Sequence, residues 1–329
     1  MSDNKSLKIL IIRFSSIGDI VLTSPVIRCL KLQTDAEIHY LVKPQYYTTI
    51  KANPYIDKIH QLNPNLKDTF HELKQENFDL IIDLHHNLRS LRIKKALKGI
   101  KAYSFYKMNI EKWLIVNLGI DLLQKRHIVD RYMDTVSSLG VTNDNKGLDY
   151  HIPETDRVEI NTLPLAFQKG FVAIAIGGNH LYKKLPNQKL IDICKKLNKP
   201  IVLLGGKEDA GNGQIISVAA GANVINTCGQ YTINQSASIV QQADAIITHD
   251  TGLMHIAAAF KQKIISIWGA TIPQFGMSPY LPGNGSVLIE PKGGSIRPYS
   301  KLGNHKWYKG RFTGMDFIDV DEVVNAVLN

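Results

Sequence analysis

Short apolar runs alternate with segments of helical periodicity along nearly the whole of this chain. The runs are rich in Ile, Val and Leu and carry few charges, which is typical of strands buried on both faces of a parallel sheet. They lie at residues 8–14, 37–42, 58–62, 78–84, 100–105, 171–176, 200–205, 223–226, 243–248 and 263–268. Because amphipathic segments separate the runs, the sequence predicts repeated βα units and an α/β fold.

An irregular stretch at residues 151–170 separates two such series of similar size. It has no periodicity and contains Pro153 and Pro164, which suits a connection between domains. The chain has 329 residues, enough for two cores. We therefore predict two Rossmann-like domains that face each other, with ligands at the carboxyl ends of their strands. The predicted divisions are 1–155, 156–316 and a closing helix at 317–329, opened by Asp319 and running to Leu328.

The formal net charge of +10 indicates an anionic partner, such as a nucleic acid, a membrane surface or a phosphorylated substrate. Much of the excess lies between Leu84 and Trp113, where eight basic residues face one acid. These eight are Arg89, Arg92, Lys94, Lys95, Lys98, Lys101, Lys107 and Lys112. The stretch is either an anion-binding surface or a solvated helix face. It lacks the interleaved aromatic residues of a nucleic-acid module, so no nucleic-acid partner is expected.

The ends and cysteines of the chain indicate its compartment. Met1–Ser6 is polar and does not resemble a signal peptide, and no apolar run approaches the roughly 20 residues that cross a bilayer. Cys29, Cys194 and Cys228 are too few and too scattered for a disulfide framework or a zinc site. We expect a cytoplasmic protein with reduced thiols, either free or peripheral on the inner face of the cytoplasmic membrane.

The segment Thr248–Ala259 carries the strongest local signal. An apolar strand ends there, turns through Thr251 and Gly252 and enters an Ala-rich helix. Backbone N–H groups at such a helix start attract phosphate, and the Thr251 hydroxyl adds a further donor. His255 lies one turn further on the same face. The alternative is that Asp250 or Thr251 merely caps the helix and that His255 is a packed structural residue.

Two more strand ends in this half of the chain carry polar groups. Gly177-Gly178-Asn179 follows one strand and Lys183-Lys184-Leu185-Pro186 precedes a helix, so a lysine and a helix N-terminus can neutralise one diphosphate together. In Gly205–Asp209, the carboxylate of Glu208 can accept hydrogen bonds from ribose hydroxyls. The alternatives are a solvated lysine pair and an acid favoured by the helix dipole.

In the first half, Asp19 lies where the opening strand turns into its helix. It is either a group facing the ligand or an N-terminal capping acid. The turn lacks the G-x-G-x-x-G pattern, which argues against a dinucleotide-dependent oxidoreductase.

Together, the segments Ile9–Asp19, Lys183–Pro186, Gly205–Asp209 and Asp250–Ala258 resemble, in this order, motifs of the ADP-heptose:lipopolysaccharide heptosyltransferase family. The resemblance implies a GT-B fold whose second domain binds most of the donor. It implies an inverting, metal-independent transfer of a heptose, or a similar sugar, from an ADP-sugar to a lipopolysaccharide inner-core acceptor. No cofactor and no metal ligand are expected, and no Asp-x-Asp signal is visible near either predicted cleft.

The same resemblance assigns the catalytic roles. Asp19 corresponds to the general base, which removes a proton from the acceptor hydroxyl. Lys183 corresponds to the donor-phosphate lysine and stabilises the departing charge together with N–H groups around Thr251 and Gly252.

Further correspondences concern the ligands. Thr251, Gly252 and His255 match the family's diphosphate-binding turn, and Asp250 matches a carboxylate near the transferred sugar. Glu208 matches the acid near the ribose. Tyr231, in a loosely matching loop, is assigned to the donor. Independently of the resemblance, Arg89, Arg92 and Lys95 of the basic stretch, with Ser15, are assigned to an anionic glycolipid acceptor.

Two alternatives to a glycosyltransferase stay open on the sequence. One is a GT-B-fold sugar-nucleotide epimerase or hydrolase, which needs the same diphosphate site but no saccharide acceptor. The other is a non-catalytic nucleotide-binding protein.

Overall fold

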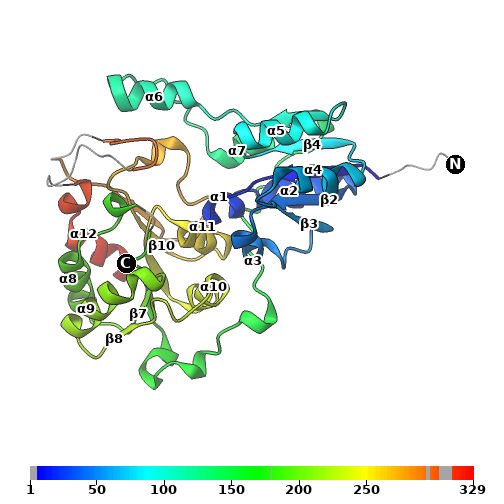
Figure 1. The fold of residues 1–329 in the computed structure, drawn as a ribbon. Helices are drawn as coiled ribbons and strands as arrows, with labels where there is room; N and C mark the ends of the chain where they lie inside the picture. Colours follow the sequence, from blue (N-terminus) through cyan, green and yellow to red (C-terminus); the bar gives the residue numbers. More distant parts are fainter. Residues whose placement is uncertain (1–5, 179, 294–296, 304–312) are drawn as a thin grey trace. The chain divides into compact units, whose positions relative to one another are not determined.

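The structure is a computed structural model that describes residues 6–178, 180–293, 297–303 and 313–329. Asn179, part of the predicted glycine-rich turn, lies outside them. The chain divides into two compact units (Figure 1). The first unit comprises Met1–Lys107 and Arg126–His151, and the second comprises Met108–Lys125 and Ile152–Asn329. The division after His151 lies near the predicted one at residue 155, but the grouping of Met108–Lys125 with the second unit does not follow from the order of elements.

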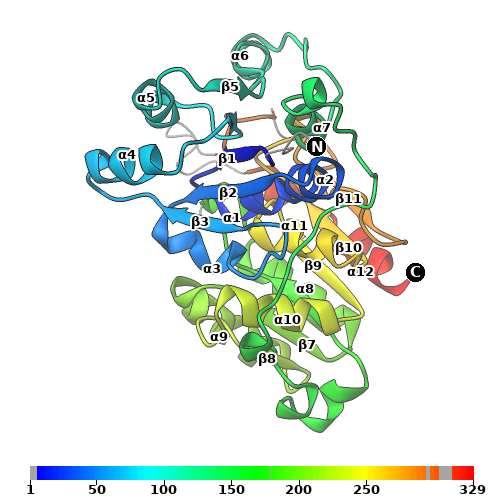
Figure 2. The same ribbon diagram turned by 90° about the vertical axis from the view of Figure 1, so that its right-hand side faces the viewer.

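The first unit is built on a five-stranded sheet in the order β3-β2-β1-β4-β5. All neighbouring strands are parallel, and β1, β2 and β3 lie side by side in Figure 2. The strands are β1 (Lys8–Ile12), β2 (Glu37–Val42), β3 (Lys58–Gln61), β4 (Leu80–Asp83) and β5 (Lys101–Ser104). The helices are α1 (Ile17–Val21), α2 (Ser24–Thr34), α3 (Tyr47–Ile50), α4 (Leu66–Gln75), α5 (Leu88–Ala96) and α7 (Ile128–Met133).

The second unit has a six-stranded parallel sheet in the order β11-β10-β9-β6-β7-β8, the strand order of a dinucleotide-binding sheet read from its far edge. The strands are β6 (Val172–Ala175), β7 (Ile201–Leu204), β8 (Val224–Asn226), β9 (Ala245–His249), β10 (Ile264–Ile267) and β11 (Val287–Ile289). The helices are α6 (Asn109–Leu118), α8 (Asn187–Leu197), α9 (Ala210–Ala220), α10 (Ile233–Gln242), α11 (Gly252–Ala259) and α12 (Val320–Leu328).

The ten predicted strands are confirmed, with ends shifted by one or two residues at several of them. The eleventh strand, β11, falls in a stretch rich in Gly and Pro and is not among the predicted strands. Val287 and Leu288 are exposed there, so only Ile289 contributes the buried apolar signal that marks the other strands. Short 3₁₀ turns within residues 151–170 agree with the irregular connection.

The closing helix also forms as expected. The Asp319 side chain accepts hydrogen bonds from the backbone N–H groups of Asp321 and Glu322, at 2.9 and 3.3 Å. Val323 and Val327 of α12 lie in the core of the second unit. All three cysteines are buried and free. Over the described ranges, we find no helix with both the length and the apolar character to cross a bilayer.

Candidate functional site

The turn between β1 and α1 places Asp19 in the first turn of a helix. Its Oδ2 accepts hydrogen bonds from the hydroxyl and the backbone N–H of Ser16, at 2.8 and 3.2 Å. This is a capping box, so Asp19 is the capping acid that one interpretation predicted. The Asp19 carboxylate is also partly exposed, so it is compatible with the second interpretation, a group that faces the ligand.

Arg13 pairs with the other oxygen of this carboxylate, at 2.6 Å from Nη2 to Asp19 Oδ1. The guanidinium is buried and also donates to the carbonyls of Ser15 and Leu84 and to the hydroxyl of Tyr132. Burial, the largest single effect, would lower the pKa of Arg13, but the charge and hydrogen bond of Asp19, together with Tyr132 and Tyr40, more than offset it and the pKa is raised. An adjacent cation favours the ionised form of a carboxylate, which is the form that accepts a proton.

His85 follows β4, the neighbour of β1 in the sheet, and was not predicted as a site residue. Its ring lies 4.6 Å from that of Phe14, and its Nδ1 is buried with no hydrogen-bond partner among the described atoms. Burial, assisted by the charge of Arg13, lowers the pKa of His85 to about 3, so the imidazole is neutral. Its position at a strand end beside β1 was the signal that could have identified it.

In the second unit, the carboxyl ends of the adjacent strands β6 and β9 bring together Lys183 and Asp250. Lys183 ends the 3₁₀ turn Leu181–Lys183, and its Nζ lies 2.5 Å from Asp250 Oδ2. Thr271, which follows β10, donates to the same oxygen at 3.0 Å. Both partners of the ion pair are largely buried. The structure therefore brings these two distant residues together, with the lysine paired to a carboxylate.

In the turn into α11, the side chain of the N-cap residue leaves the backbone N–H groups of the helix start uncapped. Thr251 is the N-cap residue by position, but its side chain makes no capping hydrogen bond, and its hydroxyl lies 3.3 Å from that of Thr248. The capping alternative for Thr251 is therefore wrong. The turn after β6 comes close, since a Cβ on Gly178 would lie 3.3 Å from Thr251 Cγ2. These two turns and Lys183 border one helix N-terminus, the arrangement that binds phosphate in many proteins.

The lysine segment is held in place by His249, the last residue of β9. The Leu185 backbone N–H donates to His249 Nε2 at 3.0 Å. Burial, with the nearby charge of Lys184, lowers the pKa of this histidine to about 4, so it stays a neutral acceptor. Lys184 itself pairs at 2.7 Å with the buried Asp209. Lys184 therefore has a structural role, whereas Lys183 faces the helix start.

The other predicted donor residues occupy neighbouring positions. Glu208 is exposed in the 3₁₀ turn Lys207–Asp209 after β7. Tyr231 is half-buried in the turn after β8, and burial raises its pKa. His255 is buried within α11, one turn after Thr251.

A pocket of about 350 Å³ lies beside this site in the second unit. Arg297 lines it, donating to Glu290 Oε1 at 2.8 Å and to the Thr271 carbonyl at 2.5 Å. Thr271 thus connects the pocket wall to Asp250. The other lining residues are Ile115, Asp121, Ile272, Gln274, Pro291 and Gly293. Thr271 and Arg297 were missed because the segment around Arg297 has no periodicity to place it.

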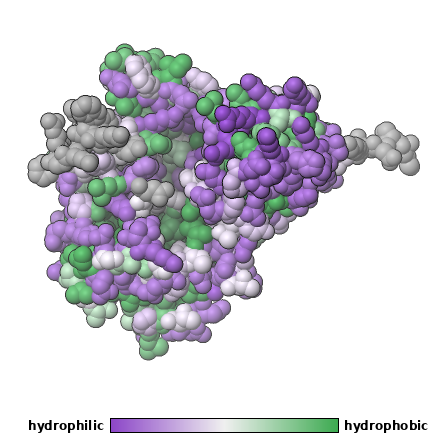
Figure 3. All heavy atoms as spheres, in the orientation of Figure 1, coloured by the Kyte–Doolittle hydropathy of each residue, from purple (hydrophilic) through white to green (hydrophobic). Residues whose placement is uncertain are grey.

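Four of the eight basic residues of the basic stretch lie on α5. Arg89, Arg92 and Lys95 are exposed, and the visible face of the first unit is largely hydrophilic (Figure 3). Lys94 differs, because it pairs with the buried Asp83 at 2.9 Å and donates to Ser104 at 2.7 Å. Lys94 is therefore part of the fold, and the other three remain candidates for an anionic ligand.

Comparison with known proteins of similar sequence identifies the functional class of this chain. The family model described as glycosyltransferase family 9 (heptosyltransferase) matches residues 67–291. The chain belongs to this family. It is therefore a glycosyltransferase, which excludes the epimerase, the hydrolase and the non-catalytic nucleotide-binding protein as its class.

Two curated proteins illustrate the relationship of this family 9 member to others. Lipopolysaccharide heptosyltransferase 1 of Campylobacter coli is 26% identical over 297 residues, which cover 80% of this chain and 84% of the relative. Lipopolysaccharide heptosyltransferase 3 of Escherichia coli K12 is 24% identical over 277 residues, covering 77% and 80%.

Solved structures agree on the GT-B fold. A family 9 glycosyltransferase from Veillonella parvula has a TM-score of 0.78 at 20% identity, with 98% of this chain and 96% of that chain covered. The ADP-heptose heptosyltransferase II of E. coli has a TM-score of 0.73 at 19% identity, covering 98% of each chain. The fold expected for this family 9 glycosyltransferase is confirmed.

Proposed function

We propose that this glycosyltransferase moves a heptose, or a similar sugar, from an ADP-sugar to a lipopolysaccharide inner-core acceptor, with inversion and without a metal ion. The observation that carries the proposal is the convergence of Lys183, Asp250 and Thr251 at the N-terminus of α11, where the Thr251 side chain makes no capping hydrogen bond. The names of the curated relatives support the acceptor class. A heptosyltransferase of E. coli with the same fold was solved with ADP, which supports the nucleotide.

The donor diphosphate would lie against the first turn of α11. Backbone N–H groups there and the partial positive charge of the helix end favour an anion. Lys183 would exchange Asp250 for a phosphate oxygen, so its charge would meet the diphosphate when the donor binds. A fixed cation and oriented N–H groups stabilise the departing diphosphate as a metal does in other enzymes.

Neighbouring strand ends would hold the rest of the donor. Glu208, in the turn after β7, is exposed and available to accept hydrogen bonds from ribose hydroxyls. Asp250, released by Lys183, would face the transferred sugar with Thr271 as its remaining partner. Tyr231 and His255 also belong to the proposed donor-binding residues, but their positions indicate no particular contact with the donor.

Asp19 would act as the general base. It takes the proton of the acceptor hydroxyl while that oxygen forms a bond to the anomeric carbon, and the bond from this carbon to the β-phosphate oxygen breaks. The electron pair of the broken bond leaves with ADP, and attack from the opposite face inverts the configuration. Ser16 and Arg13 orient the carboxylate and favour its ionised form.

The acceptor would be an anionic glycolipid, with Ser15 near the base and Arg89, Arg92 and Lys95 along α5. The same helix exposes Leu88 and Leu91, at 77% and 42%, beside these cations. Apolar side chains next to basic ones favour the interface of an anionic bilayer. We therefore propose that the enzyme acts in the cytoplasm, peripheral to the inner membrane face that presents its acceptor.

One experiment tests the reaction. Release of ADP from ADP-heptose is measured with and without a lipopolysaccharide inner-core acceptor, in the presence of a chelator. We expect release that requires the acceptor and survives chelation. Equal release without acceptor would indicate hydrolysis, and a preference for UDP- or GDP-sugars would contradict the adenine nucleotide.

A further inference from the structure

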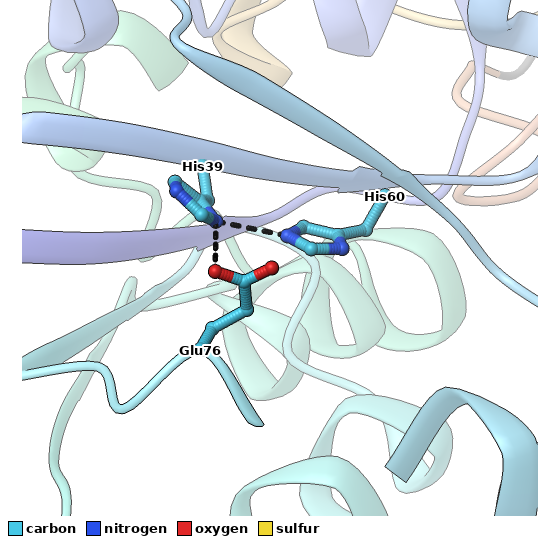
Figure 4. Close-up of side chains that lie close together, drawn as sticks. All are labelled: His39, His60 and Glu76. Atoms are coloured by element: carbon cyan, nitrogen blue, oxygen red, sulfur yellow. Dashed lines mark hydrogen bonds and ion pairs between the residues drawn. The ribbon is translucent and has the colours of Figure 1, made fainter. Parts of the chain in front are cut away.

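We propose that His39, His60 and Glu76 form a binding site for a divalent transition-metal ion of the Zn²⁺ class, within the first unit and separate from the proposed catalytic residues. His39 lies on β2, His60 on β3, and Glu76 is the residue that ends α4. The three side chains point toward one another (Figure 4). This inference does not depend on the proposed reaction.

Sheet register explains why the two histidines meet. His60 pairs with Leu41, and His39 lies two residues before Leu41 on the same strand. Residues two apart on a strand point to the same face, so both rings project from the same side of the sheet. Glu76 reaches that side from the end of α4, in a part of the chain that the sequence pattern does not connect with either strand.

The distances between the candidate ligand atoms suit a metal ion. His39 Nδ1 lies 2.9 Å from His60 Nε2 and 3.8 Å from Glu76 Oε2, and all three atoms are within 4.8 Å of one another. Around a tetrahedral Zn²⁺ with bonds of about 2.0–2.1 Å, neighbouring ligand atoms are roughly 3.3 Å apart. The two separations given for His39 differ from this value by about 0.4–0.5 Å, so small side-chain movements would bring these atoms to it.

In each histidine, one ring nitrogen faces the other histidine (the inner nitrogen) and one faces away from it (the outer nitrogen). The partners of the outer nitrogens are the most specific evidence for a metal site. His39 Nε2 lies 2.8 Å from Glu37 Oε1, and His60 Nδ1 is bonded to Glu72 Oε1. An ionised carboxylate only accepts hydrogen bonds, so each neutral imidazole donates from its outer nitrogen. Both inner nitrogens then present lone pairs to each other. Metal-binding histidines typically have this arrangement, in which a carboxylate fixes the ring and leaves the inner nitrogen for the metal.

A proton is the competing way to join the two inner nitrogens. It would make one histidine cationic in a place where both rings are only 1% exposed. Phe78 adds apolar surroundings, with its ring edge-on to both, at 5.1 Å from His39 and 6.2 Å from His60. A metal ion would also bring charge into this place, but its bonds to both imidazoles and to the Glu76 carboxylate would compensate that charge.

Two lysines lie close to the Glu76 carboxylate and contribute to the charge balance of the proposed metal site. Lys58 pairs with Glu76 Oε1, and Lys8 lies 3.4 Å from Glu76 Oε2 and 3.0 Å from Glu37. Lys58 therefore holds one oxygen while the other faces the histidines. Lys8 keeps Glu37 as its partner when Oε2 turns to the metal. Glu37, Glu72 and Glu76 outnumber these two cations around the site, which favours a dication.

Two imidazoles and one carboxylate are a ligand set of Zn²⁺ sites, with a water in the fourth position. The ion would join β2, β3 and the end of α4, so its expected effect is on the stability of the first unit. A ligand that binds only the folded state raises the melting temperature, here by on the order of 5 °C at saturation.

The test uses the full-length protein after chelator treatment and removal of the chelator. Zn²⁺ is titrated calorimetrically, Co²⁺ is used as a visible-absorption probe, and melting is followed with and without Zn²⁺. We expect one ion per chain, tetrahedral Co²⁺ bands and the melting shift. Absence of low-micromolar binding by the parent protein would overturn the proposal without any variant.

Variants locate the ion. His39→Gln and His60→Gln should each abolish the Co²⁺ bands, and Glu76→Gln, which changes a partly exposed residue, should weaken binding about 10-fold or more. His71→Gln, on the exposed face of α4, is the matched control and should bind like the parent. If His39→Gln and His60→Gln fail to fold, the metal affinity of Glu76→Gln decides whether the three residues are the ligands. Binding that Glu76→Gln leaves unchanged, or that His71→Gln reduces equally, overturns the assignment.

Discussion

Lys183 Nζ lies 2.5 Å from Asp250 Oδ2 at the start of α11, so the cation proposed to bind the donor diphosphate is paired with a carboxylate of the same site. The donor must break this pair in order to use the lysine. The carboxylate keeps Thr271 as a hydrogen-bond donor after the exchange. In the proposed mechanism, the pair therefore links nucleotide binding to the release of Asp250 toward the sugar.

Replacement of Lys183 by Ala should weaken ADP binding. A hydrogen bond to a charged group contributes about 1.5–3 kcal/mol, which corresponds to a loss of roughly 10- to 150-fold in affinity. Calorimetry with ADP measures the change. Lys196→Ala, which removes an exposed lysine paired with Asp321 on α12, is the control and should bind ADP normally. Equal affinities of Lys183→Ala and Lys196→Ala would contradict the diphosphate assignment.

Asp250→Asn should have the opposite effect on the nucleotide. It removes the carboxylate that competes for Lys183, so ADP affinity should stay constant or rise, whereas turnover of the sugar donor should fall by 10-fold or more, on the scale of one charged hydrogen bond. The two variants together separate nucleotide binding from sugar positioning. A large loss of ADP affinity in Asp250→Asn would show that the carboxylate organises the nucleotide site.

Much of the proposed donor site was predicted from the sequence, because residues at the carboxyl ends of parallel strands meet at one edge of a sheet. Lys183 and Asp250 are 67 residues apart and still touch, since β6 and β9 are neighbours in the sheet. The role of Lys184 could not be predicted from the sequence in the same way. Only the structure shows that the buried Asp209 takes it as a partner.

Other features could not be predicted from the sequence, each for a different physical reason. Thr271 and Arg297 are joined through a backbone carbonyl, a contact that no sequence pattern encodes. The pair His39 and His60 depends on strand register, which the separate strand patterns do not determine. Segment Met108–Lys125 joins the second unit because Met108 and Leu123 pack with Phe275, a contact over a long chain separation.

Charge removal on α5 tests the acceptor proposal. Arg89, Arg92 and Lys95 are changed together to Gln, and we expect a higher acceptor KM that depends less on salt, because screening acts on the lost attraction. Kinetics at two ionic strengths and sedimentation with anionic vesicles measure the effect. The charge-matched control changes Lys51, Lys67 and Lys74, which are also exposed in the first unit. Identical behaviour of the two triple variants would mean that α5 is a solvated face.

Acid should destabilise the second unit through His249. Its pKa is lowered to about 4 by burial, whereas an unfolded histidine titrates near 6.5. Between these values the unfolded chain binds the extra proton, so stability is complete above about pH 6.5 and falls as the pH approaches 4, by about 3 kcal/mol in total. Urea unfolding from pH 8 to pH 5 measures the slope.

His249→Gln keeps an acceptor for the Leu185 N–H but does not titrate, so its unfolding free energy should depend less on pH than that of the parent. His85, with a pKa of about 3, contributes in the same direction, and part of the slope therefore remains. His71→Gln serves again as the exposed control. A slope that His249→Gln leaves unchanged would show that this histidine is not the group that titrates on unfolding.

The last prediction concerns Asp19. Asp19→Asn keeps an oxygen for the Ser16 hydrogen bonds but removes the proton acceptor and the charge facing Arg13. If Asp19 is the base, kcat should fall by about 10²- to 10⁴-fold, which equals roughly 3–5 kcal/mol of barrier, while ADP affinity stays normal. Some stability is lost as well, about 1–3 kcal/mol, although Arg13 keeps the acceptors Ser15, Leu84 and Tyr132.

A matched control separates the base from the cap. Asp316 forms a capping box with Thr313 in the turn Gly314–Phe317, with the same Oδ2 contacts that Asp19 makes to Ser16. Asp316→Asn should lower stability by about 1 kcal/mol or less, because Asn caps nearly as well as Asp, and should leave kcat unchanged. Melting curves at the assay temperature ensure that both variants are folded. A folded Asp19→Asn enzyme whose kcat matches that of Asp316→Asn would make Asp19 a structural residue and require another base.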